Sequence, residues 1–92
     1  MTIAAFDDRA PDGPDVTDYD ERHRPTYWRL LDAAGEDADW REVVRIVFGI
    51  DPVAEPERAS VVHATHLARA RWMSETGYRY YLGPQIARNA SK

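Results

Sequence analysis

The chain of 92 residues is 43% hydrophobic with a net charge of −4, which suits one small domain with a single core. It has no cysteine, which excludes disulfide bridges and thiolate metal sites and favours a reducing compartment. It shows no signal-peptide pattern and no apolar run of about 18 residues, so we expect a cytoplasmic protein that is neither secreted nor inserted in a membrane.

Charge divides the chain into acidic and basic parts. Residues 1–21 hold seven acidic side chains against one arginine, and residues 32–57 hold eight against two. Residues 58–92 reverse this balance, with six basic side chains against Glu75 alone. The single net charge therefore conceals a strongly uneven distribution along the chain.

The first 18 residues favour disorder. They combine Pro11, Gly13 and Pro14 with several aspartates and few large apolar side chains, so burial cannot offset the entropy of ordering the backbone. We predict a disordered acidic arm at 1–18, a folded domain at 19–83 and a frayed tail at 84–92. The arm is interpreted as a solubilising tail or, alternatively, as a regulatory segment that repels DNA.

The segment RPTYWRLLDAAG, residues 24–35, predicts the first helix. Pro25 is tolerated in a first helical turn, and Gly35 marks the stop. The apolar stripe consists of Tyr27, Leu30, Leu31 and Ala34. Trp28 lies to one side of this stripe, where it either extends the apolar face or remains exposed.

The segment DWREVVRIVFG, residues 39–49, predicts a short second helix. Asp39 and Glu42 have the spacing of a capping box, and Gly49 suits the left-handed residue that ends a helix. The apolar positions with helical spacing are Trp40, Val43, Val44 and Val47. The β-branched residues also fit a strand, but the caps at both ends favour a helix.

A longer third helix is predicted from Pro56 to about residue 76, with Gly77 as its end. Glu55 and Glu57 flank Pro56 and suit the positive end of the helix dipole. The apolar stripe of this helix includes Ala59, Val62, His66, Leu67, Ala70 and Met73. The aromatic segment YRYYLG that follows has to lie back on the helices or remain without contacts.

This order of elements predicts an all-α fold, a small three-helix variant of the helix-turn-helix. The connector between the second and third helices spans residues 49–55, whereas such a turn usually has about three or four residues. We therefore predict a helix-turn-helix with an extended turn.

Patterns typical of catalysis or metal binding are missing from the sequence. His63 and His66 are three residues apart, but no cysteine and no obvious neighbouring acid offers the third ligand of a zinc site. There is no Gly-rich phosphate loop, no nucleophile elbow and no free carboxylate pair. A folded part of about 65 residues also leaves little room for a closed pocket. We expect neither an enzyme nor a bound metal or cofactor.

DNA binding is the first function that a helix-turn-helix suggests, because its second helix places its first turn in the major groove. The residues predicted to face DNA here are Glu55, Glu57, Arg58 and Val61. Phosphate contacts supply most of the affinity of such modules. A turn with two glutamates therefore predicts a face that has lost the positive charge needed for DNA, with weak or no DNA binding. More basic residues follow along the chain, which leaves a DNA-binding repressor open as an alternative.

Four blocks of sequence, in this order, resemble one protein family: LLDA, ADWREVVRIVFGIDP, EPERA and HLARARWMSETGYRYYL. The family is named only as a domain of unknown function and occurs in regulators of conjugative-element transfer in proteobacteria. The resemblance covers about residues 20–82. It implies an extended-turn helix-turn-helix, which would account for the long connector.

Some members of this family form the C-terminal part of transcriptional activators such as FseA, in which one basic face binds DNA and the opposite face packs on an N-terminal domain. Others are short, acidic and stand alone, and this chain resembles those. The resemblance implies an antiactivator that binds the activator's N-terminal domain in place of the activator's own helix-turn-helix. That would block the excision and transfer genes of an integrative and conjugative element. The resemblance also suggests a quorum-sensing activator of the LuxR type as a second target.

Exposed aromatic side chains and arginines carry a disproportionate share of binding energy at protein interfaces. The residues predicted on this basis to contact the partner are Trp28, Arg69, Arg71, Tyr80 and Tyr81. We expect a monomer with Leu67 and Trp72 in its interior, although the surplus of aromatics also fits an oligomerisation module. The sequence does not separate core aromatics from docking aromatics, and it does not identify the activator.

Overall fold

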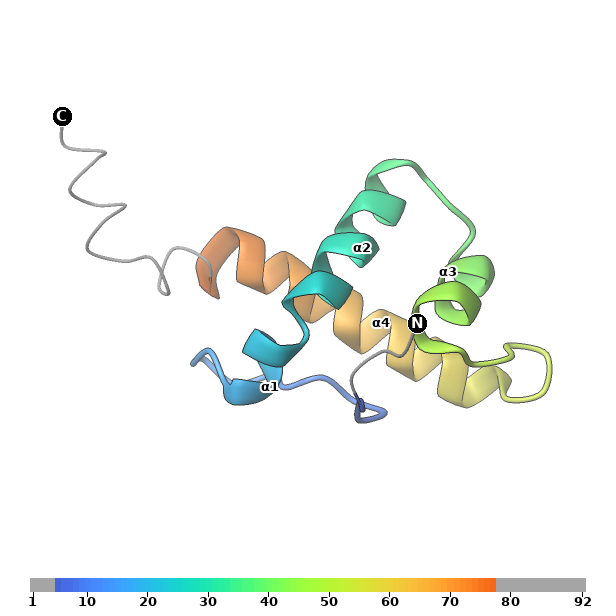
Figure 1. The fold of residues 1–92 in the computed structure, drawn as a ribbon, viewed down its shortest axis with the longest axis horizontal. Coiled ribbons are helices and arrows are strands. Elements are labelled where there is room, and N and C mark those ends of the chain that lie inside the picture. The colour runs from blue at the N-terminus through green and yellow to red at the C-terminus, as the bar shows by residue number, and fades with distance from the viewer. Residues whose placement is uncertain (1–4, 78–92) are drawn as a thin grey trace, which may run out of the picture.

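The computed structural model describes residues 5–77, and this part of the chain contains helices and no strands (Figure 1). The helices are α1 (Asp18–Arg22), α2 (Arg24–Gly35), α3 (Trp40–Phe48), α4 (Pro56–Trp72) and the π-helix η1 (Met73–Gly77). The predicted all-α class and the three predicted helices are confirmed. The short helix α1 was not predicted, and the last predicted helix changes from α to π type at Met73.

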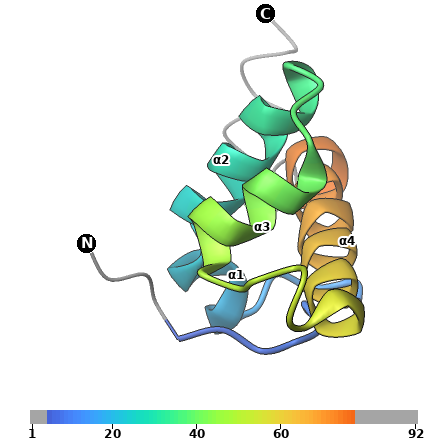
Figure 2. The ribbon, with the colours of Figure 1, turned by 90° about the vertical axis from the view of Figure 1, so that its right-hand side faces the viewer.

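The three longer helices surround one small hydrophobic core. Each of α2, α3 and α4 contacts the other two, and α2 crosses α4 in Figure 1. Figure 2 shows α3 beside α2, with α4 along the other side. The core consists of Leu30, Val43, Val44, Val47, Phe48, Ile50, Ala59 and Val62. The helical stripes predicted from the sequence therefore supply most of this core.

Local hydrogen bonds explain where the helices begin and end. The carboxylate of Asp39 accepts a hydrogen bond from the amide of Arg41 at 3.0 Å, and Gly49 ends α3 in the left-handed region with φ of 71°. A reciprocal capping box forms at the start of α1, between Thr17 and Asp20. The chain leaves α2 after Gly35, but Asp37, with φ of 59°, is the residue in the left-handed conformation.

The extended turn between α3 and α4 is an ordered loop. Ile50 is 2% exposed and anchors the loop in the core. The carboxylate of Asp51 accepts from the amide of Val53 at 2.9 Å, and the Asp51 carbonyl accepts from the amide of Glu55 at the same distance. The connector of residues 49–55 is therefore stabilised by one core contact and by hydrogen bonds of its own.

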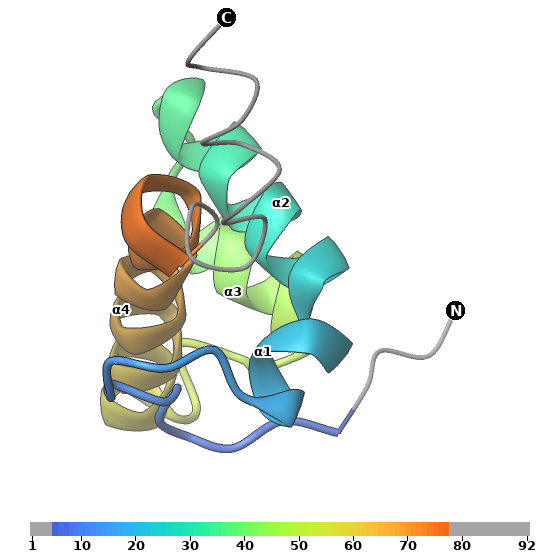
Figure 3. The same cartoon turned by 90° about the vertical axis from the view of Figure 1, so that its left-hand side faces the viewer.

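Residues 5–17 correct the prediction of a disordered acidic arm at 1–18. This N-terminal segment forms neither helix nor strand, but it runs along α1 and α4 (Figures 1 and 3). The ring of Phe6 packs edge-on against Phe48 at 5.0 Å between centroids, and Ala10 is 9% exposed. The half-buried ring of Phe6, the buried Ala10 and the hydrogen bonds described below offset the entropy cost of ordering this segment. Residues 84–92, predicted as a tail, lie outside the described residues.

None of the helices within residues 5–77 is long and apolar enough to cross a membrane.

Candidate partner-binding site

Arg69 of α4 and Asp20 of α1 form an ion pair that is closed off from solvent. Arg69 Nη2 lies 2.8 Å from Asp20 Oδ2, and the two side chains are 2% and 0% exposed. Arg69 Nε donates to the other carboxylate oxygen at 3.0 Å, so the pair is bidentate. Helical spacing places Arg69 on the stripe of Val62 and His66, which turns its side chain inward.

Three further hydrogen bonds converge on the Asp20 carboxylate. The backbone amide and the hydroxyl of Thr17 donate at 2.9 and 3.1 Å, and the Tyr27 hydroxyl donates at 2.8 Å. Burial raises the pKa of Asp20, but the hydrogen bonds from Arg69, Thr17 and Tyr27 outweigh it and hold this pKa below its usual value. Asp20 is therefore a charged group in the interior, and it joins α1, α2 and α4.

The same arginine fastens the N-terminal segment to α4. Arg69 Nη1 donates to the Gly13 carbonyl and Nη2 to the Asp15 carbonyl, both at 2.7 Å. Its guanidinium also lies over the half-buried ring of Trp72, 3.9 Å from the centroid. Arg69 was predicted to contact the partner at the surface, and its burial corrects that prediction. A guanidinium carries five N–H donors. The guanidinium of Arg69 makes four hydrogen bonds in all, two to the Asp20 carboxylate and one to each of these two carbonyls.

The N-terminal segment also covers the first half of α4. Arg58 Nε donates to the Asp8 carboxylate at 2.9 Å, and Arg58 Nη1 donates to Glu55 at 3.2 Å. The amide of Ala10 donates to the Thr65 hydroxyl at 3.2 Å. These contacts follow one stripe of α4, since positions 58, 65 and 69 repeat with helical spacing. The chain's own acidic segment thus lies along the stripe of α4 that carries Arg58, Thr65 and Arg69.

The other residues of the predicted DNA-facing set lie at the start of α4 and just before it. Glu55 and Glu57 are exposed at the start of α4, and Val61 is half-buried. The first turn of α4 therefore presents carboxylates to solvent.

A second network, around His66, also links the N-terminal segment to the helices. His66 is 0% exposed, and burial lowers its pKa, so the ring is neutral. Its Nδ1 donates to the Val62 carbonyl at 2.7 Å, which leaves Nε2 to accept from the Tyr19 hydroxyl at 2.6 Å. The Tyr19 oxygen accepts in turn from the amide of Asp7 at 3.0 Å.

His23 completes this buried aromatic group. It stacks on Tyr19 at 3.9 Å between ring centroids, and its ring nitrogens lie 2.8 Å from the Tyr19 carbonyl and 3.0 Å from the Ala5 carbonyl. The two buried histidines are thus occupied by hydrogen bonds. Among the residues described, no group of three or more His, Cys, Asp or Glu side chains is placed to hold a metal ion.

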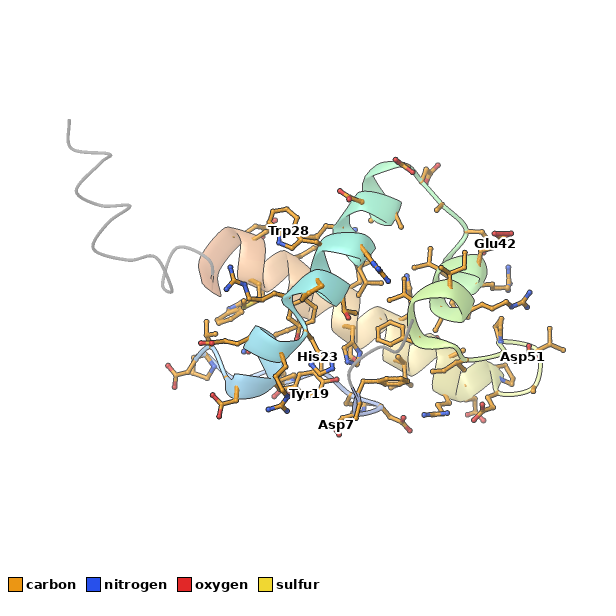
Figure 4. All side chains as sticks on the ribbon, viewed as in Figure 1. Asp7, Tyr19, His23, Trp28, Glu42 and Asp51 are labelled. Carbon is orange, nitrogen blue, oxygen red and sulfur yellow. The ribbon has the colours of Figure 1, made fainter. Side chains whose placement is uncertain are left out.

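Trp28 and Arg71 are the predicted partner residues that the structure leaves at the surface. The Trp28 side chain projects from α2 (Figure 4) and is 64% exposed. Arg71 near the end of α4 is also exposed. The predicted contacts Tyr80 and Tyr81 lie outside the described residues. The structure thus keeps Trp28 and Arg71 available at the surface and removes Arg69 from it.

Two exposed apolar residues were missed by sequence reasoning. Ile46 on α3 is 71% exposed and Val53 in the connector is 82% exposed. Ile46 lies outside the apolar stripe of α3, and this position in the helical pattern could have predicted its exposure. The buried roles of Asp20 and His23 were also missed, although the capping-box spacing at Thr17 and Asp20 was present in the sequence.

Comparison with known protein families and with curated proteins finds no match to this chain. The family resemblance of the four sequence blocks therefore stays a prediction.

Proposed function

We propose that this chain is a stand-alone antiactivator of the QseM type, which binds an FseA-like transcriptional activator and keeps it from activating excision and transfer genes. The observation that carries the proposal is that the chain pairs the first two arginines of α4 internally. Arg58 bonds to Asp8 and Glu55, and Arg69 bonds to Asp20. With two of its three arginines already paired, α4 offers fewer charges to DNA phosphates.

The mechanism is competition for one docking surface. An activator built from two domains needs them docked to hold a DNA-competent arrangement. A free copy of one docking surface that binds the partner domain shifts this equilibrium by mass action. The acidic character of the chain fits such a role, because a competitor has to occupy the partner domain without itself holding the promoter.

The proposed docking surface is centred on Trp28. A tryptophan that is 64% exposed offers a large apolar contact area together with one N–H donor. Arg71 lies at its rim in this proposal, with Tyr80 and Tyr81 as further contacts from the segment after η1. A LuxR-type activator is a second possible partner for the same surface.

Fluorescence anisotropy of a labelled promoter duplex tests the proposal. The chain is titrated first into the duplex alone and then into the duplex already bound by the FseA-like activator. We expect no change with the duplex alone and a fall in anisotropy as the activator is removed. Failure to remove the activator at concentrations well above those of both components would refute the proposal.

Two variants with similar changes locate the surface. Trp28→Ala is expected to weaken competition by about 30-fold, which corresponds to the roughly 2 kcal/mol typical of a tryptophan at the centre of an interface. Ile46→Ala, an equally exposed apolar residue on α3, is the control and should compete as the unmodified chain does. Equal competition by both variants would place the contact surface elsewhere.

The alternative is a DNA-binding repressor, and the succession of α3, an ordered connector and α4 favours it. In that case the chain alone raises the anisotropy of the duplex. The affinity would also fall as salt is added, because released counterions drive phosphate binding. The same titration therefore separates the two functions.

A further inference from the structure

Residues 5–10 form neither helix nor strand, and they lie against the helices through two side chains. The ring of Phe6 packs on Phe48 of α3 at 5.0 Å between centroids. Two positions later, the carboxylate of Asp8 bonds to α4, whereas Asp7 between them is exposed. The contact therefore depends on an aromatic ring and a carboxylate that are two residues apart.

One arginine of α4 contacts both of these side chains. Arg58 Cζ lies over the Phe6 ring, 5.7 Å from its centroid, and Arg58 Nε donates to the Asp8 carboxylate at 2.9 Å. A guanidinium in this position attracts an aromatic ring by a cation–π interaction and a carboxylate by a charge-assisted hydrogen bond. These two side chains are thus the sequence-specific part of the contact.

The remaining hydrogen bonds are made by backbone groups of the segment. The amide of Asp7 donates to the Tyr19 hydroxyl at 3.0 Å, and the amide of Ala10 donates to the Thr65 hydroxyl at 3.2 Å. When extended peptides bind to proteins, main-chain hydrogen bonds give affinity and individual side chains give specificity. The helices offer both kinds of contact to residues 5–10.

Residues 5–10 are held less firmly than the part of the segment that follows. The ion pair of Arg58 with Asp8 is open to solvent, with 40% and 57% of the side chains exposed, and such pairs contribute little to stability. Residues 13–15 are instead held at two carbonyls by Arg69, which is 3% exposed. Local opening begins where few buried contacts hold the chain. Residues 5–10 can therefore leave the helices while residues 13–15 stay fixed.

We propose that the side chains beneath residues 5–10 form a binding site for an acidic segment of a partner protein, in which a carboxylate follows an aromatic residue by two positions. This Arg58 site consists of Tyr19, Phe48, Arg58 and Thr65. Residues 5–10 act as a lid that closes the site in the free chain and opens to admit the partner. The chemistry of the partner follows from the lid, whose ring and carboxylate already satisfy the site.

The lid makes the Arg58 site autoinhibited. A tethered segment competes with a free one at an effective concentration in the millimolar range. A lid that is open about one tenth of the time weakens the binding of a competitor about tenfold. The site includes neither Trp28 nor Arg71, so this inference does not rest on the proposed function.

Backbone-amide NMR of the isotopically labelled full chain tests the proposal. The probe is the acetylated and amidated peptide AFDDRAPD, which is the sequence of residues 5–12. It is titrated into the unmodified chain and into the variant Phe6→Ser/Asp8→Ser, whose own lid lacks both specific contacts. We expect the amide signals of Arg58 and Thr65 to shift in the variant, with a dissociation constant about tenfold lower than in the unmodified chain.

A second peptide and a second variant make the result specific. The peptide ADDFRAPD has the same composition and charge but exchanges the aromatic residue and the carboxylate, and it should leave the signals unchanged. Asp8→Lys changes an exposed side chain and repels Arg58, while the Phe6 ring stays in place on the core. This variant should also bind AFDDRAPD more tightly than the unmodified chain does, which keeps the test valid where loss of the Phe6 ring disturbs the fold.

Three outcomes would overturn the proposal. In the first, neither variant binds AFDDRAPD at about 5 mM, above the millimolar range in which a tethered segment competes. In the second, the two peptides bind equally, so that charge alone attracts them. In the third, the unmodified chain binds as tightly as the variants, so that residues 5–10 do not close the site. The titration uses neither DNA nor an activator, so its failure is distinct from failure of the proposed function.

Discussion

Replacing Arg69 by Met is expected to cause the largest loss of stability of any single change considered for this chain. The substitution keeps a long side chain on α4 but removes the charge that faces Asp20. Five hydrogen bonds reach the Asp20 carboxylate, two of them from Arg69. Without Arg69 the carboxylate stays buried with only Thr17 and Tyr27 as partners.

The expected loss follows from the burial of the pair. Both side chains are almost completely closed off from water, and removing one partner of such a pair costs about 3–5 kcal/mol. The carbonyls of Gly13 and Asp15 lose their donor in the same step. A domain of this size has a free energy of unfolding of roughly 5–14 kcal/mol, so Arg69→Met should remove a large fraction of it.

Urea unfolding followed by circular dichroism measures the loss. The control is Arg71→Met, on the same helix but exposed, which should change the free energy of unfolding by no more than about 0.5 kcal/mol. In the double variant Asp20→Asn/Arg69→Met neither buried group is charged, so it should lose about 2 kcal/mol less than the sum of the two single variants. Additive losses, or a loss for Arg69→Met no larger than for Arg71→Met, would refute a buried and coupled ion pair.

The same pair fixes how stability depends on acid. The pKa of Asp20 in the folded chain lies below its ordinary value of 3.8, so the stabilisation is fully present above that value. It is lost as the pH falls through the lower pKa of the folded state. Urea midpoints measured between about pH 5 and pH 2 should therefore fall less steeply in Asp20→Asn than in the unmodified chain.

Three further changes should have measurable effects on urea unfolding. Tyr27→Phe removes the 2.8 Å hydrogen bond to the charged Asp20 and should cost about 1.5–3 kcal/mol. Gly49→Ala should cost about 1 kcal/mol because Gly49 has φ of 71°, whereas Gly35→Ala, where no positive φ occurs, should be neutral or stabilising. Burial lowers the pKa of His66 below the ordinary histidine value of 6.5, so the free energy of unfolding should fall as the pH drops below that value. The fall should be at most about 1.4 kcal/mol per pH unit. The variant His66→Gln should flatten this slope.

The helices could be predicted because their signals are local. Asp39 and Gly49 are close to the ends of the same helix, and an apolar stripe repeats every three or four residues within one element. α1 was missed because it has only five residues and its sequence, DYDER, contains no apolar periodicity. Its capping box at Thr17, its packing on α2 and its side-chain hydrogen bonds to α4 supply the stability that its own composition does not.

The buried ion pair and the docked N-terminal segment could not be predicted from composition. Asp20 and Arg69 are 49 residues apart, so no local pattern connects them. Arguments about disorder weigh apolar side chains against net charge, but Arg69 holds residues 13 and 15 by their backbone carbonyls. Any residue type provides such carbonyls, so the segment's own sequence carried no sign of this contact.

The placement of charge in the fold bears on function more directly than the net charge does. The C-terminal part of the chain is basic, yet Arg58 faces the acidic segment and Arg69 faces Asp20, so two of its cations are satisfied inside the molecule. The carboxylates of Glu55 and Glu57 remain at the surface of the turn that would approach phosphates. A recognition helix of the usual kind requires the opposite distribution, with cations outside and acids elsewhere. Within the described residues, two of the arginines of α4 are therefore engaged in contacts within the chain, and this distribution is the support for the proposed protein partner.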